Sequence, residues 1–382
     1  MINKLKKMDI GILTLLFCFM VISAVLLYSV GSADPDYASS YQRTMLFYGL
    51  GFVVLIFMTL VDYRIILKFW LYIYAVGIIL LVAVKMFGST LNGAAGWFKI
   101  TETLSFQPAE AAKIVLIIAV AYMMGKRQGE KLLFTKDLLP IAAVAGLPFL
   151  LVLTQPDLGN AIIYLVIVLG MLWIGNVKYS HALLGLAIVI GTLTLFITLF
   201  TTYNDEIKAF AKEKNVNHWY ERINTFVDPD SADPDAKYQS RNARIAVGSG
   251  GLTGDGFLKG DSKNRGVVPY TYSDSIFTVV GEEFGFQGSA VLLLLYFLLI
   301  YRMIMIAFQC FDLRGAFIII GIVSMYVFQV FQNVGMMIGI MPITGITLPF
   351  VSYGGTSLLL NMMCIGLVFS IQAHQERYQL EN

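Results

Sequence analysis

The sequence predicts an all-α integral membrane protein of about ten transmembrane helices, with a large extracellular loop before the eighth helix and a broken, re-entrant segment before the last. Apolar residues make up 57% of the 382 residues and charged residues only 14%, whereas a soluble domain has about 25% charged residues. The mean hydropathy is +0.73. Apolar runs of spanning length also recur along the whole chain. These observations indicate that the bilayer is the solvent for much of the surface.

Ten segments have the length and composition of spanning helices. A spanning helix needs about 20 mostly apolar residues. The expected spans are 9–30, 44–61, 64–84, 106–124, 138–153, 158–175, 179–202, 275–301, 314–338 and 354–373. Several contain Pro or Gly, which membranes tolerate only where neighbouring helices or a cavity satisfy the backbone. We therefore expect one polytopic membrane domain over residues 1–382.

Basic residues in the short loops predict the orientation. With the N-terminus inside, thirteen Lys and Arg lie on the inner side and three on the outer side. The inner set is Lys4, Lys6, Lys7, Arg64, Lys68, Lys126, Arg127, Lys131, Lys136, Lys178, Arg302, Arg314 and Arg377, and the outer set is Arg43, Lys85 and Lys99. This bias predicts that both termini are cytoplasmic. The polar loop of about residues 203–273 is then extracellular, because long loops cross regardless of charge.

The distribution of special residues excludes several classes of function. No basic stripe or zinc-finger spacing occurs, so nucleic acid is not an expected partner. The three cysteines and three histidines are widely dispersed, which favours neither a disulfide framework nor a His-based metal site.

Few ionisable residues lie inside the expected spans, and Glu110 and Lys113 are the clearest. Residues within a span that carry charge are functional candidates, because their burial in lipid is costly. The i, i+3 spacing places both side chains on one helix face, shortly after Gln107 and Pro108. The pair either lines a substrate pocket or locks helix packing as a buried ion pair.

Two further carboxylates stand at the starts of expected helices. Asp157 follows Gln155 and Pro156, where it either caps the sixth helix or contacts substrate. Asp274 stands where the long loop meets the eighth helix. At this position it is either a general base at the rim of a membrane cavity or a cap. Glu282 and Glu283 follow about two turns later, and their helix would then have to line a cavity.

The long loop offers groups that suit an anion. The glycine-rich segment from Gly248 to Gly256 could cradle phosphate through backbone N–H groups, although it matches no Walker or dinucleotide pattern. Arg222 and Arg244, with Lys237 and Arg241, could meet a pyrophosphate. The alternative is that all four are solvated loop charges.

The stretch from Gln332 to Ser357 is too rich in Gly and Pro for an uninterrupted helix. We interpret it as a helix end, a folded-in hairpin and a new helix start. Broken elements of this kind commonly line binding sites in membrane proteins, so Ser352 and Gly354 are candidate substrate-binding residues.

This stretch resembles the signature of the SEDS family, the RodA, FtsW and SpoVE group. The order is Asn333, Gly339, Pro342 and Gly345, followed by the run Ser-Tyr-Gly-Gly-Thr-Ser that begins at Ser352. Similar blocks occur at Gln107-Pro-x-Glu110-x-x-Lys113, Gln155-Pro-Asp-Leu-Gly159, Ser273-Asp274-x-Ile-Phe and Gly281-Glu-Glu-Phe-Gly285. The resemblance covers essentially the whole chain.

The resemblance implies a peptidoglycan glycosyltransferase that joins lipid II units into glycan strands on the outer face of the bacterial cytoplasmic membrane, with undecaprenyl pyrophosphate leaving. It implies that Asp274 is the essential acid and that Glu110 and Lys113 act in a central cavity, where Gln107, Gln155 and Asp157 are expected to bind substrate. It also implies a class B penicillin-binding protein, a transpeptidase, as partner, alongside other proteins of cell elongation or division. A divalent cation, Mg²⁺ or Mn²⁺, could bridge the pyrophosphate and Asp274, but no ligand cluster demands one.

The chain departs from the family pattern at several positions. Val268-Pro269-Tyr270 stands where the family usually has Leu-Pro-Glu, and Gly96 stands where it usually has a basic residue before Trp97. The step Asp62-Tyr-Arg64 favours a RodA-like branch.

Two other functions fit the same pattern physically. Broken helices and intramembrane charges also suit a lipid flippase or transporter, although we find only the weak Gln-Pro echo at 107 and 155 as internal symmetry. A non-catalytic scaffold for a penicillin-binding protein is the third alternative.

Overall fold

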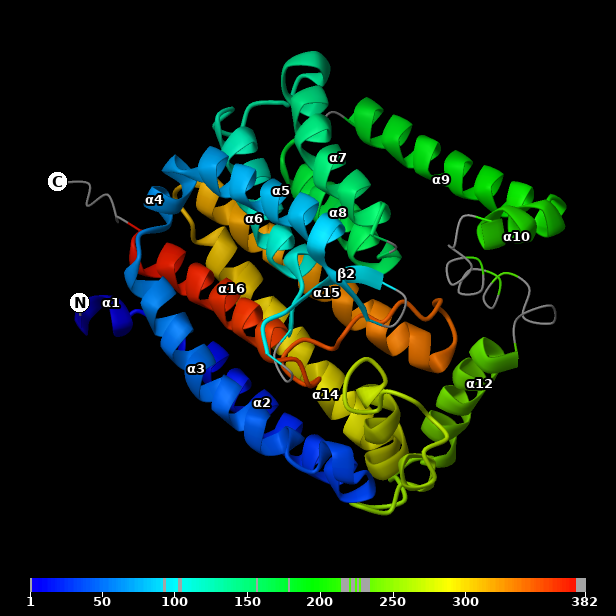
Figure 1. Ribbon diagram of the computed structural model, residues 1–382. Helices are drawn as coiled ribbons and strands as arrows, with labels where there is room; N and C mark the ends of the chain where they lie inside the picture. Colours follow the sequence, from blue (N-terminus) through cyan, green and yellow to red (C-terminus); the bar gives the residue numbers. More distant parts are fainter. Residues whose placement is uncertain are drawn as a thin grey trace.

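A computed structural model describes residues 2–91, 94–101, 105–155, 157–177, 179–213, 220, 224, 227 and 234–375. Within these ranges each of the ten expected spans contains a helix (Figure 1). These helices are α2 (Ile10–Ala33), α3 (Ser40–Leu60), α5 (Trp70–Phe87), α6 (Pro108–Gly125), α7 (Leu139–Leu153), α8 (Leu158–Ile174), α9 (Tyr179–Thr202), α14 (Ile276–Phe308), α15 (Leu313–Ile338) and α16 (Gly355–Ala373). The all-α membrane fold is therefore confirmed.

Shorter elements connect the long helices. They are α1 (Ile2–Leu5), the 3-10 turn η1 (Pro35–Tyr37), α4 (Tyr63–Lys68), β1 (Ser89–Leu91), β2 (Ala94–Lys99), β3 (Ser105–Phe106), the π-helical turn η2 (Phe134–Leu138), α10 (Asn204–Glu213), α12 (Pro234–Ser249) and α13 (Asp261–Asn264). The three strands form one antiparallel sheet in the order β1-β2-β3. The expected span 64–84 is divided, because α4 ends at Lys68 and α5 begins at Trp70.

Length and hydropathy support the membrane assignment for most of these helices. Within the described residues, eight helical stretches of at least 18 residues are long and apolar enough to cross a bilayer. Helix α8 is also apolar and has 17 residues. The centre of the bundle is formed by α6, α16 and α15, whose apolar windows are 72%, 67% and 61% buried, against 17% for α5 and for the η2–α7 stretch. Helices α5 and α7 therefore face outward.

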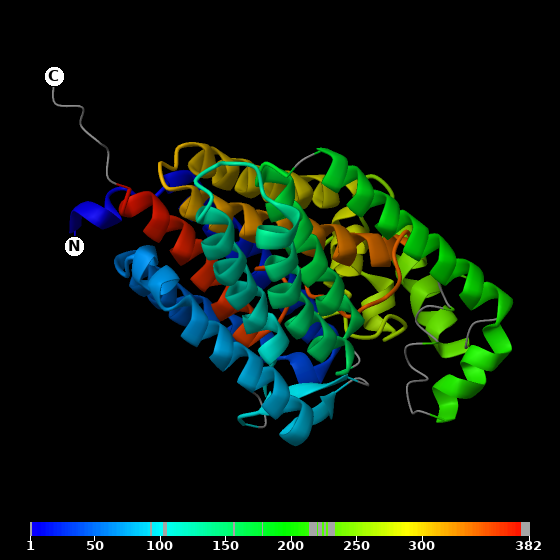
Figure 2. The ribbon, with the colours of Figure 1, turned by 90° about the horizontal axis from the view of Figure 1, so that it is seen from above.

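Helix α1 and the end of α16 lie at one end of the bundle, which we call the termini end, and α10 and α12 lie toward the opposite end, which we call the loop end (Figure 1). The view from above shows the same separation (Figure 2). In both views α9 runs along the edge of the bundle, and its main packing partner is α10.

Helix α14 is broken near its start, which the sequence did not predict. Gly285 has φ 63° and ψ −158°, so the helical bonds are interrupted there. The long loop fills the break: the N–H groups of Phe286 and Gln287 donate to the carbonyls of Gly251 and Leu252 at 2.9 and 3.1 Å. A side chain at Gly254 would place its Cβ 2.2 Å from the carbonyl oxygen of Glu283. The glycine-rich segment thus lacks side chains because it packs directly on the α14 backbone.

The segment between α15 and α16 is irregular but buried, as the sequence pattern indicated. Helix α15 ends at Gly339, which has φ 85°, and residues 340–354 form no regular helix. Hydroxyl groups of the surrounding helices satisfy its carbonyls: Tyr48 bonds Phe350, Tyr296 bonds Pro349, and Ser23 bonds Val351 at 2.8 Å. Irregular backbone at membrane depth requires such partners.

Candidate active site

Asp274 lies in the turn that joins the long loop to α14, and its side chain is nearly buried, with 9% of the residue exposed. The Ser273 hydroxyl donates to its Oδ1 at 3.1 Å. A Cβ at Gly345 would lie only 3.7 Å from its Oδ2. The carboxylate therefore faces the irregular segment between α15 and α16.

Two residues of the signature stretch hold this turn in place. The side-chain amide of Asn333 donates to the carbonyls of Asp274 and Ile346, each at 2.7 Å. The Ser352 hydroxyl donates to the Ser273 carbonyl at 2.6 Å and accepts from the Leu348 N–H at 2.8 Å. Ser352, which the sequence suggested for substrate binding, thus connects two backbone segments; contact with substrate stays a prediction.

Glu110 and Lys113 form the ion pair that their spacing suggested. Lys113 Nζ lies 2.7 Å from Glu110 Oε1, with the side chains 1% and 15% exposed. Both belong to the first two turns of α6, which begins with Pro108 after an extended Gln107.

A second group of polar side chains surrounds Asp157 at the start of α8. Its Oδ2 accepts from Gln107 Nε2 at 2.6 Å and from Asn160 Nδ2 at 2.8 Å, and its Oδ1 accepts from the Asn160 N–H at 3.0 Å. Asp157 is thus a helix cap, and it is also within electrostatic range of Glu110 and Lys113. Sequence reasoning missed Asn160, although it stands three residues after the cap, where side chains return to the capping residue.

Gln155 completes this group, which we call the polar cluster (Gln107, Glu110, Lys113, Gln155, Asp157 and Asn160). Gln155 Nε2 donates to the Leu81 carbonyl at 2.8 Å. Within the described part of the chain, Gln155 Oε1 and Asn160 Oδ1 are buried without a hydrogen-bond partner. Buried acceptors are normally paired, so these two oxygens suit donor groups of a bound ligand.

The β-sheet connects the polar cluster with the Asp274 turn. A Cβ at Gly96 in β2 would lie 3.6 Å from Gln155 Oε1 and 4.0 Å from Gln107 Nε2. At the sheet's other edge, the Thr356 hydroxyl of α16 donates to the Ser105 carbonyl of β3 at 3.0 Å. The starts of α6, α8, α14 and α16 are thereby joined by hydrogen bonds at the loop end.

The remaining loop candidates have different placements. Arg244 on α12 lies over the end of α15, because a Cβ at Gly339 would approach its Cδ to 2.6 Å. Gly354 has an extended backbone and immediately precedes α16. Arg222 lies outside the described residues.

The glycine-rich segment does not offer a free phosphate cradle. The N–H groups of Asp255 and Gly256 donate to the carbonyls of Glu282 and Glu283 at 2.9 and 3.1 Å, and the N–H of Gly254 donates to Gly250 at 2.7 Å. These donors are used inside the protein, so the structure corrects the phosphate interpretation.

Glu282 and Glu283 are buried, and both hold the long loop against α14. Glu282 Oε1 accepts from the Ser262 N–H at 2.8 Å. Glu283 Oε1 accepts from the Ser29 hydroxyl at 2.6 Å and lies 3.1 Å from Lys263 Nζ, with both charged side chains fully desolvated at 0% and 1% exposure. Lys263 was not singled out from the sequence, because it stands twenty residues before its partner in a polar loop.

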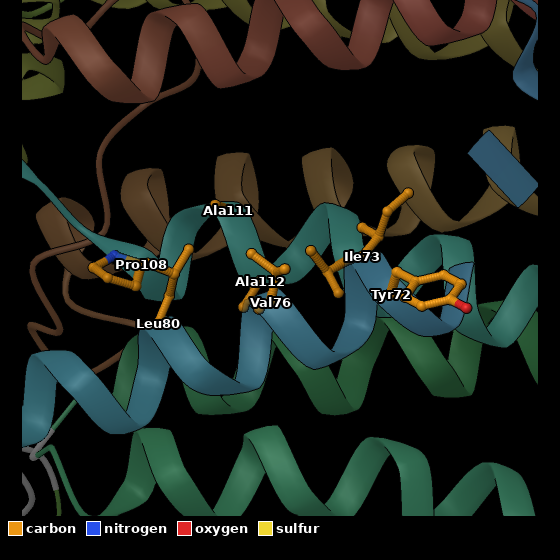
Figure 3. A pocket seen from close by; sticks show the side chains of 9 residues that line it. Tyr72, Ile73, Val76, Leu80, Pro108, Ala111 and Ala112 are labelled. Atoms are coloured by element: carbon orange, nitrogen blue, oxygen red, sulfur yellow. The ribbon is translucent and has the colours of Figure 1, made fainter. Parts of the chain in front are cut away.

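An apolar groove of about 290 Å³ runs between α5 and α6 (Figure 3). Its lining is Tyr72, Ile73, Val76, Gly77, Leu80, Pro108, Ala111, Ala112 and Val115. Pro108 adjoins Gln107, so the groove reaches the edge of the polar cluster. Such a surface suits hydrocarbon chains of the bilayer.

The fold and the site define a polytopic membrane protein with a nearly buried carboxylate and a polar cluster at one end of its bundle. The chain belongs to the FtsW/RodA/SpoVE family: the family model, described as "Cell cycle protein", matches residues 6–377.

Named relatives match along almost their whole length. The chain is 32% identical to "Peptidoglycan glycosyltransferase MrdB" of Escherichia coli (strain K12), over 97% of this chain and 94% of that protein. It is 30% identical to "Stage V sporulation protein E" of Bacillus subtilis (strain 168), over 98% and 99% of the two chains.

Solved structures show the same fold. A chain from a peptidoglycan synthase complex, studied for its coordination of polymerization and crosslinking, matches with a TM-score of 0.77 and 28% identity, covering 97% of this chain and 99% of that one. The rod shape determining protein RodA of Thermus thermophilus matches with a TM-score of 0.69 and 26% identity, covering 97% and 98%.

Proposed function

We propose that this chain is a peptidoglycan glycosyltransferase that polymerises lipid II into glycan strands on the outer face of the cytoplasmic membrane, in cell elongation and shape or in division. One observation carries the proposal: the Asp274 carboxylate lies in a turn held by Asn333 and Ser352 of the family's signature stretch. The relatives named peptidoglycan glycosyltransferases support the same reaction.

In this reaction Asp274 is the general base. As the hydroxyl oxygen of the acceptor sugar attacks the anomeric carbon of the donor sugar, its proton passes to the Asp274 carboxylate. The bond between that carbon and the pyrophosphate oxygen breaks, and undecaprenyl pyrophosphate leaves with the electron pair. Asp274 then returns its proton to solvent, so the enzyme is restored.

The charge on the leaving pyrophosphate needs stabilisation, and the loop end supplies it. The starts of α6, α8, α14 and α16 meet there, and helix starts carry partial positive charge. Lys113 in the polar cluster and Arg244 over the end of α15 carry full positive charges. Lys113 is paired with Glu110 at 2.7 Å, so a pyrophosphate would compete with Glu110 for this ammonium group.

A divalent cation, Mg²⁺ or Mn²⁺, would fit this site only as a shared ion. No group of three or more His, Cys, Asp or Glu that could hold a metal occurs among the described residues. The Asp274 carboxylate would therefore hold the ion together with phosphate oxygens of the substrate, and the ion would add charge stabilisation there.

The polar cluster binds the substrate in this proposal. Gln155 Oε1 and Asn160 Oδ1 are buried acceptors without partners, and sugar hydroxyl or acetamido groups supply the matching donors. Gln107 and Asp157 hold this surface in shape through their 2.6 Å hydrogen bond.

The loop end faces the outside in this proposal. The excess of thirteen inner over three outer basic residues supports a cytoplasmic location for both termini, and the loop end is opposite the termini end (Figure 1). The partner is a class B penicillin-binding protein, which crosslinks the new strands. The similarity to a complex that couples polymerization and crosslinking supports this assignment.

The experiment is polymerisation of labelled lipid II by the purified protein, with and without a cognate class B penicillin-binding protein and with Mn²⁺ or Mg²⁺ present. We expect ladders of glycan product that a muramidase digests. A folded complex that makes no ladder, beside a working control enzyme, contradicts the proposal. A lipid II translocation assay in liposomes then separates a flippase from a scaffold.

A further inference from the structure

Four tyrosines from three separate segments gather beside Asp274. We call Tyr37, Tyr270, Tyr272 and Tyr353 the tyrosine cluster. The rings of Tyr37 and Tyr272 stack with centroids 4.0 Å apart and an interplanar angle of 21°. Tyr270 and Tyr353 meet Tyr272 edge to face, at 6.3 and 6.1 Å.

The cluster is tied to the turn that carries Asp274. The Tyr270 carbonyl accepts from the N–H groups of Ser273 and Ser275 at 2.9 and 3.2 Å, and the Tyr272 carbonyl accepts from the Tyr353 N–H at 2.9 Å. Tyr272 is also within electrostatic range of Asp274. The tyrosine cluster and the Asp274 carboxylate therefore belong to one hydrogen-bonded turn.

Tyr270 has a strained backbone and an exposed ring. Its φ is 57°, in the left-handed region that a bulky residue rarely adopts. Glycine or asparagine would fit this turn with less strain, so the ring is retained against a backbone cost. Its residue exposure is 39%. Strain of this kind concentrates at functional sites.

The rings offer the chemistry that a sugar requires. The faces of aromatic rings carry negative charge density, which attracts the polarised C–H groups of a pyranose face, and phenol hydroxyls bond sugar hydroxyls. Burial, and next the hydrogen bond with Tyr37, raise the pKa of Tyr272 above its ordinary value. The Tyr272 phenol therefore stays uncharged near the Asp274 carboxylate.

Tyrosines are also enriched at membrane–water interfaces, but tyrosines enriched for that reason need not contact one another. Here three rings contact Tyr272, which stands two residues before Asp274, and Tyr270 has a strained backbone. We propose that the tyrosine cluster is a subsite for a pyranose ring of the glycan, adjacent to Asp274; this inference rests on the proposed function.

The test separates the ring of Tyr270 from its backbone. Tyr270→Gly removes the ring and suits a positive φ, whereas Tyr270→Phe keeps the ring. The control is Tyr301→Ala, because Tyr301 is 50% exposed on α14 and stacks only on Phe297 among the ring contacts of the described residues. The probe is a soluble tetrasaccharide of alternating N-acetylglucosamine and N-acetylmuramic acid, and binding to the full-length protein is measured by calorimetry beside lipid II polymerisation.

We expect Tyr270→Gly to weaken tetrasaccharide binding and raise the lipid II KM about tenfold, with a smaller change in kcat. Tyr270→Phe should recover most of the affinity, and Tyr301→Ala should bind as the unchanged protein does. Equal binding by Tyr270→Gly, or no binding by the unchanged protein at millimolar probe, overturns the subsite. Because binding is read without turnover, an inactive but sugar-binding protein contradicts the proposed reaction and leaves the subsite supported.

Discussion

Two buried lysine–glutamate pairs of this protein have similar chemistry but different architecture. Lys113 and Glu110 lie one turn apart on α6, 2.7 Å from each other, and the side chain of Glu110 is 15% exposed within the polar cluster. Lys263 and Glu283 connect the long loop to α14 at 3.1 Å and are fully enclosed. Ser29 of α2 joins the second pair.

The difference indicates separate roles. The α6 pair connects one helix to itself, so it joins no separate segments of the fold, and the partial exposure of Glu110 lets a ligand approach the pair. The loop pair joins three segments of the chain. A charge without its partner in such an enclosed place is very costly, so the second pair should be needed for the folded state.

Breaking the loop pair should have the largest effect on stability. Lys263→Met or Glu283→Gln alone should lower the free energy of unfolding by about 3–5 kcal/mol, because each leaves one buried charge unpaired. The double variant should recover much of this loss, since it buries no charge. Thermal unfolding in detergent micelles measures all three.

The matched control for the loop pair is Arg265→Met. Arg265 and Asp261 form an ion pair at 3.2 Å in the same loop, but both side chains are more than 70% exposed. We expect a change of about 0.5 kcal/mol or less. Equal losses of unfolding free energy for the buried and the exposed pair would show that burial does not determine how much an ion pair contributes to stability.

Breaking the α6 pair should instead reduce activity. Lys113→Met removes a charge that can stabilise the leaving pyrophosphate, so we expect lipid II polymerisation to fall about 10²-fold. The folded state should lose only about 2 kcal/mol, because Glu110 is partly exposed and water can solvate its remaining charge. A variant that loses stability but polymerises normally would assign the pair to packing.

The Asn333 side chain provides an uncharged comparison with the two lysine–glutamate ion pairs. Asn333→Ala leaves the carbonyls of Asp274 and Ile346 without their 2.7 Å donor. We expect a loss of about 2 kcal/mol in stability, with polymerisation slowed beyond what the unfolded fraction explains. If polymerisation falls only in proportion to the unfolded fraction, Asn333 does not position Asp274.

Among the variants of buried groups, Ser29→Ala should have the smallest effect on stability. Glu283 keeps Lys263 after this change, so only one hydrogen bond is lost, at about 1 kcal/mol. Ser32→Ala is the control, because the Ser32 hydroxyl bonds only its own helix at the Ser29 carbonyl, 2.7 Å away. The Tm of Ser29→Ala should therefore be lower than that of Ser32→Ala. Identical unfolding curves would show that the hydrogen bond from Ser29 to Glu283 does not contribute to stability.

The contrast between the pairs also explains what the sequence could predict. Helical spans and the Glu110–Lys113 pair depend on local spacing, which the sequence displays directly, and the cap at Asp157 follows from its place before a helix. Lys263 finds Glu283 only because the loop returns to the break at Gly285. Nothing in the spacing indicates that return.

The glycine-rich segment shows the same limit. Its composition was compatible with a phosphate cradle, because glycine exposes backbone N–H groups in both settings. Which carbonyls those groups meet depends on tertiary packing, here the free carbonyls of Glu282 and Glu283. The three strands pair with neighbours close in sequence, but the contacts of this sheet with Gln155 and Thr356 are distant in sequence and depend on tertiary packing as well.

The central claim is that Asp274 contributes chemistry and not stability. The most direct test measures lipid II polymerisation and thermal unfolding on the same preparation of Asp274→Asn. Asparagine keeps an acceptor for the Ser273 hydroxyl, so Tm should stay within about 2 °C, while polymerisation should fall at least about 10²-fold because the base is lost. Ladders as strong as those of the unchanged protein, or loss of activity only together with unfolding, would contradict the account.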